Sequence, residues 1–155
     1  MKRKISYDYA AMEEGVTKIL DNILAVGNPY SRIVGISRGG LIPAVMLSYK
    51  LRLPLTTISW SLRDALERES NAWLPLDVNN GERILLVDDI IDSGNTISEI
   101  LTDWDENVGG TLERNNISVA ALWYNISQDL VTPDFWHETI DRSKDDRWVE
   151  FWFDH

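Results

Sequence analysis

The sequence predicts an α/β protein with an open, mainly parallel sheet flanked by helices, a small hood and a C-terminal strand. Three short apolar runs, "RIVGIS", "RILLVDD" and "ISVAALWYN", predict buried strands, because strands covered on both faces are apolar throughout. Between these runs lie segments whose apolar residues recur at helical spacing. Strands that alternate with helices in this way are typical of a parallel sheet.

Each further element has its own local signal. A helix is expected over residues 9–26, capped by Asp8, since its apolar residues fall on one face until "GNPY" breaks the pattern. "LIPAVMLSYKL" predicts a second helix with Pro43 in its first turn, and "PLTTISW" predicts another strand. "SGNTISEILTDWDENV" predicts a turn and a helix. "QDLVTPDFWHETIDRSKDD" is expected to be irregular, and "RWVEFWF" to form a short aromatic strand.

Residues 61–82 are polar, mixed in charge and weakly periodic. Loops this long inside a small domain are usually functional lids or disordered segments. We therefore expect a mobile hood over about 61–82, with a plain solvated helix and loop as the alternative. The rest of the chain shows no repeat and no domain boundary, so residues 1–155 are expected to form a single domain.

Composition excludes several classes of function. The chain has 25 Asp and Glu against 15 Lys and Arg, which argues against a nucleic-acid partner. It has no Cys, which excludes disulfides and thiolate metal sites and fits a reducing, cytoplasmic location. No apolar stretch predicts a membrane span or a signal peptide. A polyanionic ligand must therefore be held locally, by backbone N–H groups, a few Arg or metal ions.

The stretch "LLVDDIIDSGNT" places Asp88, Asp89 and Asp92 directly after an apolar strand. In open α/β sheets, ligands bind beyond the carboxyl ends of the strands. Gly94 permits a tight turn there, and the start of the next helix offers free backbone N–H groups to an anion. The stretch therefore predicts a phosphate site beside carboxylates that bind hydroxyl groups or Mg²⁺. A sugar phosphate suits that combination.

A lone pair of acids at a strand end most often caps a helix, and three further protein classes also place acids there. Each of these classes needs a second motif. A P-loop NTPase needs an upstream G-x-x-x-x-G-K-[ST] loop, a receiver domain needs a late Lys at a strand end, and a Rossmann domain needs G-x-G-x-x-G. None of these motifs occurs in the sequence, so the three classes fit it less well than a sugar-phosphate site does.

Two motifs resemble those of one family. "ILLVDDIIDSGNT" resembles the phosphoribosyl pyrophosphate (PRPP) signature of the type I phosphoribosyltransferases, and "IVGISRGGLIPA" resembles their pyrophosphate loop. The chain is most similar to the short bacterial xanthine-guanine enzymes in its length, its "SRGG" loop and a Trp near the C-terminus. The resemblance implies transfer of the 5-phosphoribosyl group from PRPP to a nucleobase such as guanine, xanthine or hypoxanthine. It further implies release of pyrophosphate, Mg²⁺ as cofactor, and a homodimer or homotetramer.

The resemblance also implies residue roles. Asp88 and Asp89 would hold the ribose hydroxyls, directly or through Mg²⁺. Asp92 would be the general base, with a helix cap as its alternative role. The 5-phosphate loop would consist of Asp92, Ser93, Gly94, Asn95 and Thr96, and the pyrophosphate loop of Ser37, Arg38, Gly39 and Gly40. The peptide between the first two residues of the latter loop is often cis in the family.

The hood and the nucleobase site match the family less closely. Ser59 and Trp60 replace a common Ser-Tyr pair, and Arg63 and Arg68 both remain candidates to reach pyrophosphate. Tyr124 stands where the purine enzymes carry a Lys that contacts the 6-oxo group, so Tyr124 is a candidate base contact or a packing residue. The C-terminal candidates are Trp148 for stacking, the Val149 backbone for the base edge, and Glu150 for a 2-amino group.

Two alternatives to a purine enzyme stay open. One is a regulator of the same fold that senses PRPP without catalysis, although such proteins usually add a nucleic-acid-binding domain or a basic face. The other is a phosphoribosyltransferase with a non-purine acceptor.

Overall fold

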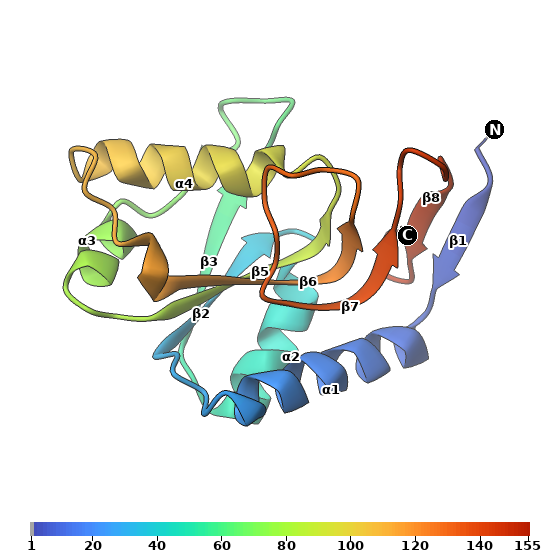
Figure 1. The fold of residues 1–155 in the computed structure, drawn as a ribbon, viewed down its shortest axis with the longest axis horizontal. Coiled ribbons are helices and arrows are strands. Elements are labelled where there is room, and N and C mark those ends of the chain that lie inside the picture. Colours follow the sequence, from blue (N-terminus) through green and yellow to red (C-terminus); the bar gives the residue numbers. More distant parts are fainter. Residues whose placement is uncertain (1) are drawn as a thin grey trace.

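The computed structural model describes residues 2–155, and its centre is a six-stranded sheet with the order β4-β3-β2-β5-β6-β7 (Figure 1). All pairs in this sheet are parallel except β3 with β4, which confirms the predicted fold class. The elements in chain order are β1 (Lys4–Tyr7), α1 (Tyr9–Ala25), β2 (Arg32–Ser37), α2 (Leu41–Leu51), β3 (Leu55–Trp60), β4 (Arg68–Glu69), α3 (Trp73–Asn79), β5 (Ile84–Ile91), α4 (Asn95–Asn107), a 3-10 turn (Arg114–Asn116), β6 (Ile117–Asn125), β7 (Phe135–Ile140) and β8 (Trp148–Phe151).

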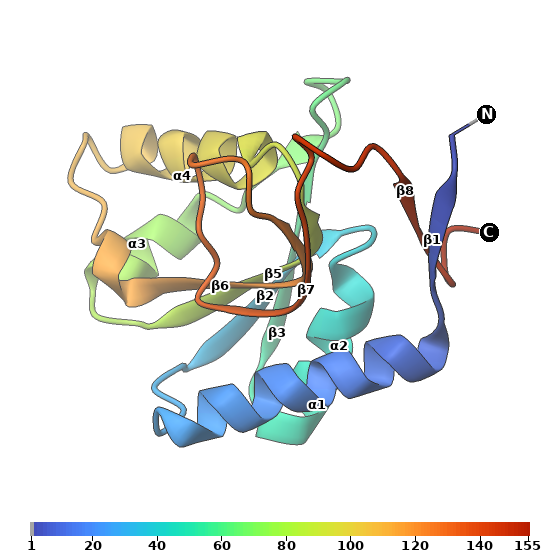
Figure 2. The ribbon, with the colours of Figure 1, turned by 45° about the vertical axis from the view of Figure 1, so that its right-hand side comes forward.

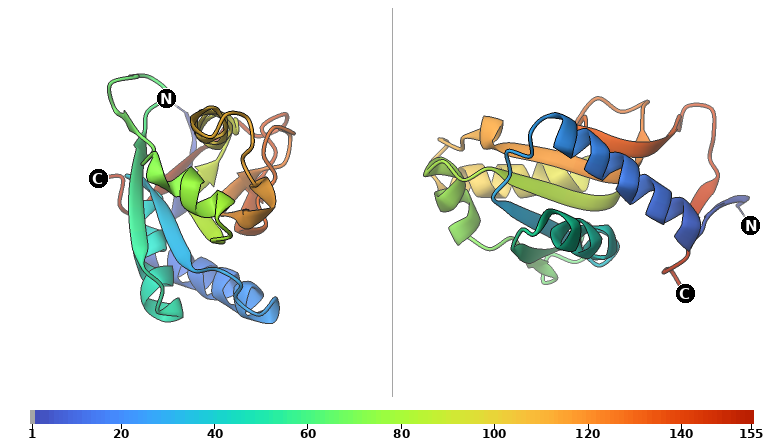
Figure 3. Two further views of the ribbon diagram at one scale, coloured as in Figure 1. Left: turned by 90° about the vertical axis from the view of Figure 1, so that its left-hand side faces the viewer. Right: turned by 90° about the horizontal axis from the view of Figure 1, so that it is seen from below.

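Helices cover both faces of the sheet. Helices α1 and α2 lie on one face, and α3 and α4 lie on the other (Figures 1 and 3). Successive strand residues alternate between the two cores: Ile33 packs with α1 and α2, whereas Val34 packs with α3 and α4. This double covering explains why the central strands are apolar throughout.

Helix α1 has the N-terminal cap and the apolar face that its sequence predicts. The Asp8 carboxylate accepts a hydrogen bond from the Ala11 backbone N–H at 2.8 Å, which satisfies one of the free donors at the helix start. The apolar face of the helix is buried against the sheet through Met12, Val16, Ile19 and Ile23. The expected helix over 9–26 is confirmed to within one residue at its end.

Three strands escaped sequence-based prediction: β1, β7 and the two-residue β4, which lies in the expected hood. β1 lies in the N-terminal segment and pairs in parallel with β8, apart from the main sheet (Figure 2). β7 lies within the stretch that was expected to be irregular, and it forms the edge of the main sheet beside β6. Its sequence, "FWHETI", mixes polar and apolar residues because an edge strand is partly exposed.

The stretch expected to form the hood, about 61–82, falls into two parts in the structure. Residues 61–67 form an excursion that projects beyond α4, and Ser59 and Trp60 pair with residues of the short strand β4 (Figure 3). The second half is wrong as a hood, because α3 is a helix whose Leu74, Pro75 and Val78 are buried under α4. The mobility of the first half remains a prediction.

Among residues 2–155, no helix combines the length and the apolar character that crossing a bilayer demands.

Gly40 closes the junction between α2 and β5. A Cβ on Gly40 would lie 2.4 Å from the Val87 carbonyl oxygen and 2.7 Å from both the Asp88 Cα and the Ile36 carbonyl oxygen. All three are backbone atoms of β2 and β5, so no side chain can move aside. Gly40 has an ordinary φ of −70°, and the constraint is therefore one of space alone.

We predict that Gly40→Ala lowers the free energy of unfolding by about 1–3 kcal/mol, because backbone strands must move apart to admit the methyl group. Thermal unfolding measures the loss. Gly109→Ala is the control, since a Cβ on Gly109 would meet no atom of residues 2–155 within 4 Å apart from its chain neighbours, and Gly109 has a φ of +66°. The control should cost about 1 kcal/mol through its backbone angle alone. Equal melting temperatures for Gly40→Ala and the parent protein would contradict the prediction.

Candidate active site

A hollow of about 270 Å³ lies at the carboxyl ends of β2 and β5. The parallel pairing of Arg32 with Ile84 through Gly35 with Val87 brings these two strand ends to the same edge of the sheet. The hollow is lined by Ile36, Ser37, Arg38, Gly39, Trp60, Leu62, Asp88, Asp89, Ile90, Ile91, Asp92, Ser93, Gly94, Thr96 and Ile97. The structure thus brings together the acidic pair and most of both predicted loops.

Asp88 and Asp89 lie in the second half of β5, after four buried apolar residues. Asp88 is 9% exposed, and burial, followed by the neighbouring Asp89 charge, raises the pKa of its carboxyl well above the usual value. Burial also raises the pKa of Asp89. Each carboxylate accepts a backbone N–H: the Asp89 N–H bonds Asp88 at 2.9 Å, and the Ile90 N–H bonds Asp89 at 2.7 Å. Two buried carboxyl groups this close favour a positive or hydroxyl-bearing partner.

The turn after β5 leads directly into α4. Gly94 adopts a φ of +83°, a conformation that favours glycine, and it is the cap residue of the helix. The Ser93 hydroxyl accepts the Asn95 backbone N–H at 3.1 Å, and the cap residue Gly94 makes no side-chain hydrogen bond to the N–H groups that follow. The uncapped N–H groups and the helix dipole give this turn the character of an anion site.

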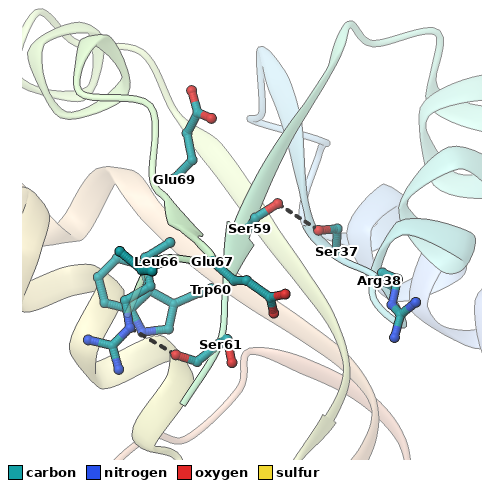
Figure 4. A pocket seen from close by; sticks show the side chains of 9 residues that line it. Ser37, Arg38, Ser59, Trp60, Ser61, Leu66, Glu67 and Glu69 are labelled. Carbon is teal, nitrogen blue, oxygen red and sulfur yellow. Dashed lines mark hydrogen bonds between the residues drawn. The ribbon is translucent and has the colours of Figure 1, made fainter. Parts of the chain in front are cut away.

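The predicted pyrophosphate loop joins β2 to α2. The peptide bond between Ser37 and Arg38 is cis. The Ser37 hydroxyl hydrogen-bonds the Ser59 hydroxyl at 2.9 Å, which ties the loop to the end of β3 (Figure 4). Gly39 lies against the acidic pair, since a Cβ there would sit 2.0 Å from the Asp89 Oδ2 atom. The backbone of this loop therefore directly faces the carboxylates of β5.

The two hood arginines have different surroundings. The Arg68 guanidinium lies 5.0 Å from the Trp60 ring centroid, donates to the Ser61 carbonyl at 2.8 Å and pairs with Glu99 of α4 at 3.3 Å. Arg63 is exposed on the excursion, and within residues 2–155 no ion pair involves its side chain. Arg68 is thus anchored to α4, whereas Arg63 remains free to reach a ligand.

Sequence reasoning missed an arginine beside Asp92. Arg142 follows β7 and binds the Asp92 carboxylate through two parallel hydrogen bonds, Nε to Oδ1 at 3.0 Å and Nη2 to Oδ2 at 3.1 Å. Such a fork is the stronger, more specific form of ion pair. Asp92 and Arg142 are 50 positions apart, so only the fold reveals their contact.

Asn125 is the second missed residue. It ends β6, is 5% exposed, and donates from Nδ2 to the Asp92 carbonyl oxygen at 3.0 Å. Its Oδ1 accepts the Arg142 backbone N–H at 3.1 Å. A buried Asn at the carboxyl end of a predicted strand was the available signal, since a buried amide requires partners.

The predicted nucleobase residues are dispersed. Tyr124 packs against Trp136, with ring centroids 5.7 Å apart, and does not line the hollow. Trp148 is 54% exposed, and Val149 beside it is buried. The Glu150 carboxylate bonds Lys4 and lies 3.6 Å from His155, and the Lys4 hydrogen bond lowers its pKa. Trp148, Val149 and Glu150 also lie outside the lining of the hollow, and they belong to β8 whereas Tyr124 belongs to β6.

The acidic pair suits a hard cation that is shared with a ligand. Among residues 2–155, no cluster of three or more His, Cys, Asp or Glu side chains could hold a metal alone. Mg²⁺ is commonly bound by one or two carboxylates together with substrate phosphates. The oxygen donors of Asp88 and Asp89, beside two loops suited to anions, fit that arrangement.

Solved structures share this architecture. A purine phosphoribosyltransferase from Pyrococcus horikoshii superposes with a TM-score of 0.73 at 21% identity, over 98% of this chain and 94% of that chain. A Neisseria gonorrhoeae protein crystallised with bound ppGpp gives a TM-score of 0.72 at 24% identity, over 100% of this chain and 91% of that chain. These likenesses support the fold.

Sequence comparison supports the family. The chain is 36% identical over 72 residues to a xanthine-guanine phosphoribosyltransferase of Idiomarina loihiensis, which is 44% of this chain and 45% of the relative. The chain therefore spans less than half the length of that curated relative. The profile of the phosphoribosyl transferase domain matches residues 7–151, which include both loops and the acidic pair. The resemblance of the two motifs is thereby confirmed, and the chain belongs to the phosphoribosyltransferase family.

Proposed function

We propose that the protein transfers the 5-phosphoribosyl group of PRPP to a purine-type nucleobase and releases pyrophosphate. The observation that carries this proposal is the convergence, in one hollow, of a buried carboxylate pair and two loops suited to anions. PRPP has matching groups: ribose hydroxyls lie between a 5-phosphate and a 1-pyrophosphate. The family to which the chain belongs supports the same assignment.

Each end of PRPP has a site on this chain. The turn from Asp92 to Thr96 would bind the 5-phosphate through backbone N–H groups at the start of α4. The loop from Ser37 to Gly40 would bind the pyrophosphate through its backbone at the start of α2. The ribose hydroxyls would then lie over Asp88 and Asp89, which face Gly39 across the hollow.

The chemical step separates charge. The C1–O bond to pyrophosphate breaks with its electron pair, and a ring nitrogen of the base forms the new bond to C1. The Asp92 carboxylate, at the rim of the hollow, would take the proton from the imidazole ring of the base. Positive charge that develops on the ribose would be stabilised by the carboxylates of β5. Mg²⁺, held by Asp88 and Asp89 with the ligand oxygens, would neutralise the leaving pyrophosphate.

Arg63 is the better candidate for the hood residue that reaches pyrophosphate. Arg68 is already engaged by Trp60, Ser61 and Glu99, whereas Arg63 is exposed near the tip of the excursion. Closure of the excursion would exclude water, which otherwise hydrolyses an oxocarbenium-like ribose.

A second candidate is a regulator that binds PRPP without catalysis. The Asp92–Arg142 pair favours it, because a guanidinium already occupies one side of the candidate base. The Neisseria neighbour, which shares the fold, was crystallised with bound ppGpp.

A base panel separates the candidates. The protein is supplied with PRPP, Mg²⁺ and, in turn, guanine, xanthine, hypoxanthine, adenine, uracil and orotate, while pyrophosphate release is measured. We expect release with at least one 6-oxopurine. Calorimetric binding of PRPP without release for every base would instead establish the regulator, and release with a pyrimidine alone would establish a non-purine acceptor.

Asp92→Ala tests the general base. We expect the turnover number to fall about 10²–10⁴-fold, because the proton of the base loses its acceptor. The PRPP dissociation constant, measured by calorimetry, should stay within about threefold, since the backbone of the turn holds the phosphate. Asp129→Ala, an exposed residue outside the hollow, is the control. Turnover of Asp92→Ala at the parent rate would refute the role.

Asp88→Asn tests the buried pair. We expect a higher melting temperature for the ligand-free variant at pH 7–8, by roughly 2–4 °C per kcal/mol, because a buried charge is removed while an oxygen acceptor remains. The raised pKa of Asp88 means that its ionisation costs stability as the pH rises. The difference should therefore fade as the pH falls toward about 4.

The same variant should lose the rise in melting temperature that PRPP with MgCl₂ gives the parent, since ligand binding to the folded state stabilises it. Asp129→Asn is the control and should keep that rise. A parent-like rise in Asp88→Asn would place the ligand away from the acidic pair.

A further inference from the structure

Arg142 joins two parts of the candidate site. Its Nε and Nη2 atoms bind the Asp92 carboxylate, which lies at the phosphate turn. Its Nη1 donates to the Arg147 carbonyl oxygen, directly before Trp148. One guanidinium therefore links the candidate base to the segment that was predicted to stack on the nucleobase.

The backbone around Arg142 is also fixed. The Asn125 side chain accepts the Arg142 N–H at 3.1 Å and donates to the Asp92 carbonyl at 3.0 Å. Asn125 is buried, so this link is shielded from water. The Arg142 side chain is 21% exposed, whereas that of Asp92 is 45% exposed. Asn125 thus fixes the backbone of both Asp92 and Arg142, and the Asp92 carboxylate is the more exposed group of the pair.

Hydrogen-bonding capacity remains on both side chains of the pair. Arginine has five N–H donors, and an ionised carboxylate has about four lone-pair sites. Two N–H groups bind Asp92, and the two on Nη1 point to the Arg147 carbonyl and, at 3.5 Å, the Asp145 carbonyl. Within residues 2–155, one Nη2 donor and about two Asp92 acceptor sites have no partner. A donor and an acceptor therefore lie side by side.

The free donor of Arg142 and the free acceptor of Asp92 match one class of nucleobase. A 6-oxopurine presents an imidazole N–H and a carbonyl oxygen on the same edge, which complement an acceptor beside a donor. Adenine presents an amino group in place of the oxygen, and that group would oppose the guanidinium N–H. A site that hydrogen-bonds a specific polar group discriminates strongly against an analogue without it.

Resting on the proposed function, we propose that Arg142 positions Asp92 for proton transfer and donates to the oxo group of a 6-oxopurine. Arg142 thereby supplies the positive charge that Tyr124, packed against Trp136, does not provide on β6. A guanidinium suits this double task, because its planar fork holds a carboxylate and still offers donors elsewhere.

The test compares Arg142→Gln, Arg142→Lys and the control Lys144→Gln. Lys144 lies in the same segment, is exposed and pairs with Asp141, away from Asp92, so its substitution removes an equal charge. Steady-state kinetics give kcat and the KM values for hypoxanthine, guanine and PRPP, and rates with adenine are measured alongside. Thermal unfolding reports on folding.

For Arg142→Gln, we expect the KM for the 6-oxopurine to rise about 10–100-fold, the range for loss of a hydrogen bond to a charged group. The KM for PRPP should change less than about twofold, and discrimination against adenine should narrow. Arg142→Lys should recover part of the loss, because it keeps the charge and loses the fork. Lys144→Gln should behave as the parent does.

Three results would overturn the inference. Parent-like base kinetics in Arg142→Gln would remove Arg142 from the site. Equal losses for PRPP and base, with a lower melting temperature, would make the pair merely structural. A higher kcat/KM would show that Arg142 inhibits the reaction.

If Arg142→Gln does not fold, Arg142→Lys provides the test, because an unchanged KM for the base in that variant would contradict the proposed role of Arg142. Failure of the parent to release pyrophosphate with any base would instead overturn the proposed function, before any variant is compared.

Discussion

The close contact between the β2–α2 loop and β5 is the constraint on which the site depends. Gly40 touches the backbone of both strands, and Gly39 touches the Asp89 carboxylate, so neither position has room for a side chain. The parallel register of β2 with β5 fixes that contact. Two loops that are about 50 positions apart in the sequence therefore meet over one pair of carboxylates. Any widening of this junction would separate the predicted sites for the two ends of the same ligand.

The junction also explains how a protein with net charge −10 can offer a site for a polyanion. The positive field is local, because it comes from uncapped starts of α2 and α4 rather than from a basic surface. The carboxylates of β5 add the opposite requirement. Burial raises the pKa of both groups, and the Asp89 charge raises the pKa of Asp88 further, so a cation or a hydroxyl partner would stabilise their ionised forms.

The sequence predicts those strands and helices that have a clear short-range pattern of apolar residues. Continuous apolar runs gave β2, β5 and β6, and helical spacing gave α1 and α2. Periodicity failed for β7 and α3, where tertiary packing decides: β7 is a mixed edge strand, and the apolar residues of α3 follow a polar excursion. Motif spacing located Asp88 to Thr96, but Arg142 and Asn125 act through contacts over 50 and 33 positions. Contacts between positions so far apart cannot be predicted from short-range sequence patterns.

The absence of a Lys on β6 shows why a single aligned position is a poor guide to the charge of a site. Tyr124 lies on the strand but packs toward Trp136, whereas the cation nearest the candidate base comes from the loop after β7. A lysine on the strand would place a point charge there. An arginine on the loop adds a mechanical link, since the same guanidinium holds Asp92 and the carbonyl before Trp148. The orientation of the carboxylate is then tied to the position of the Trp148 segment, so under the proposed function base recognition and proton transfer would depend on one group.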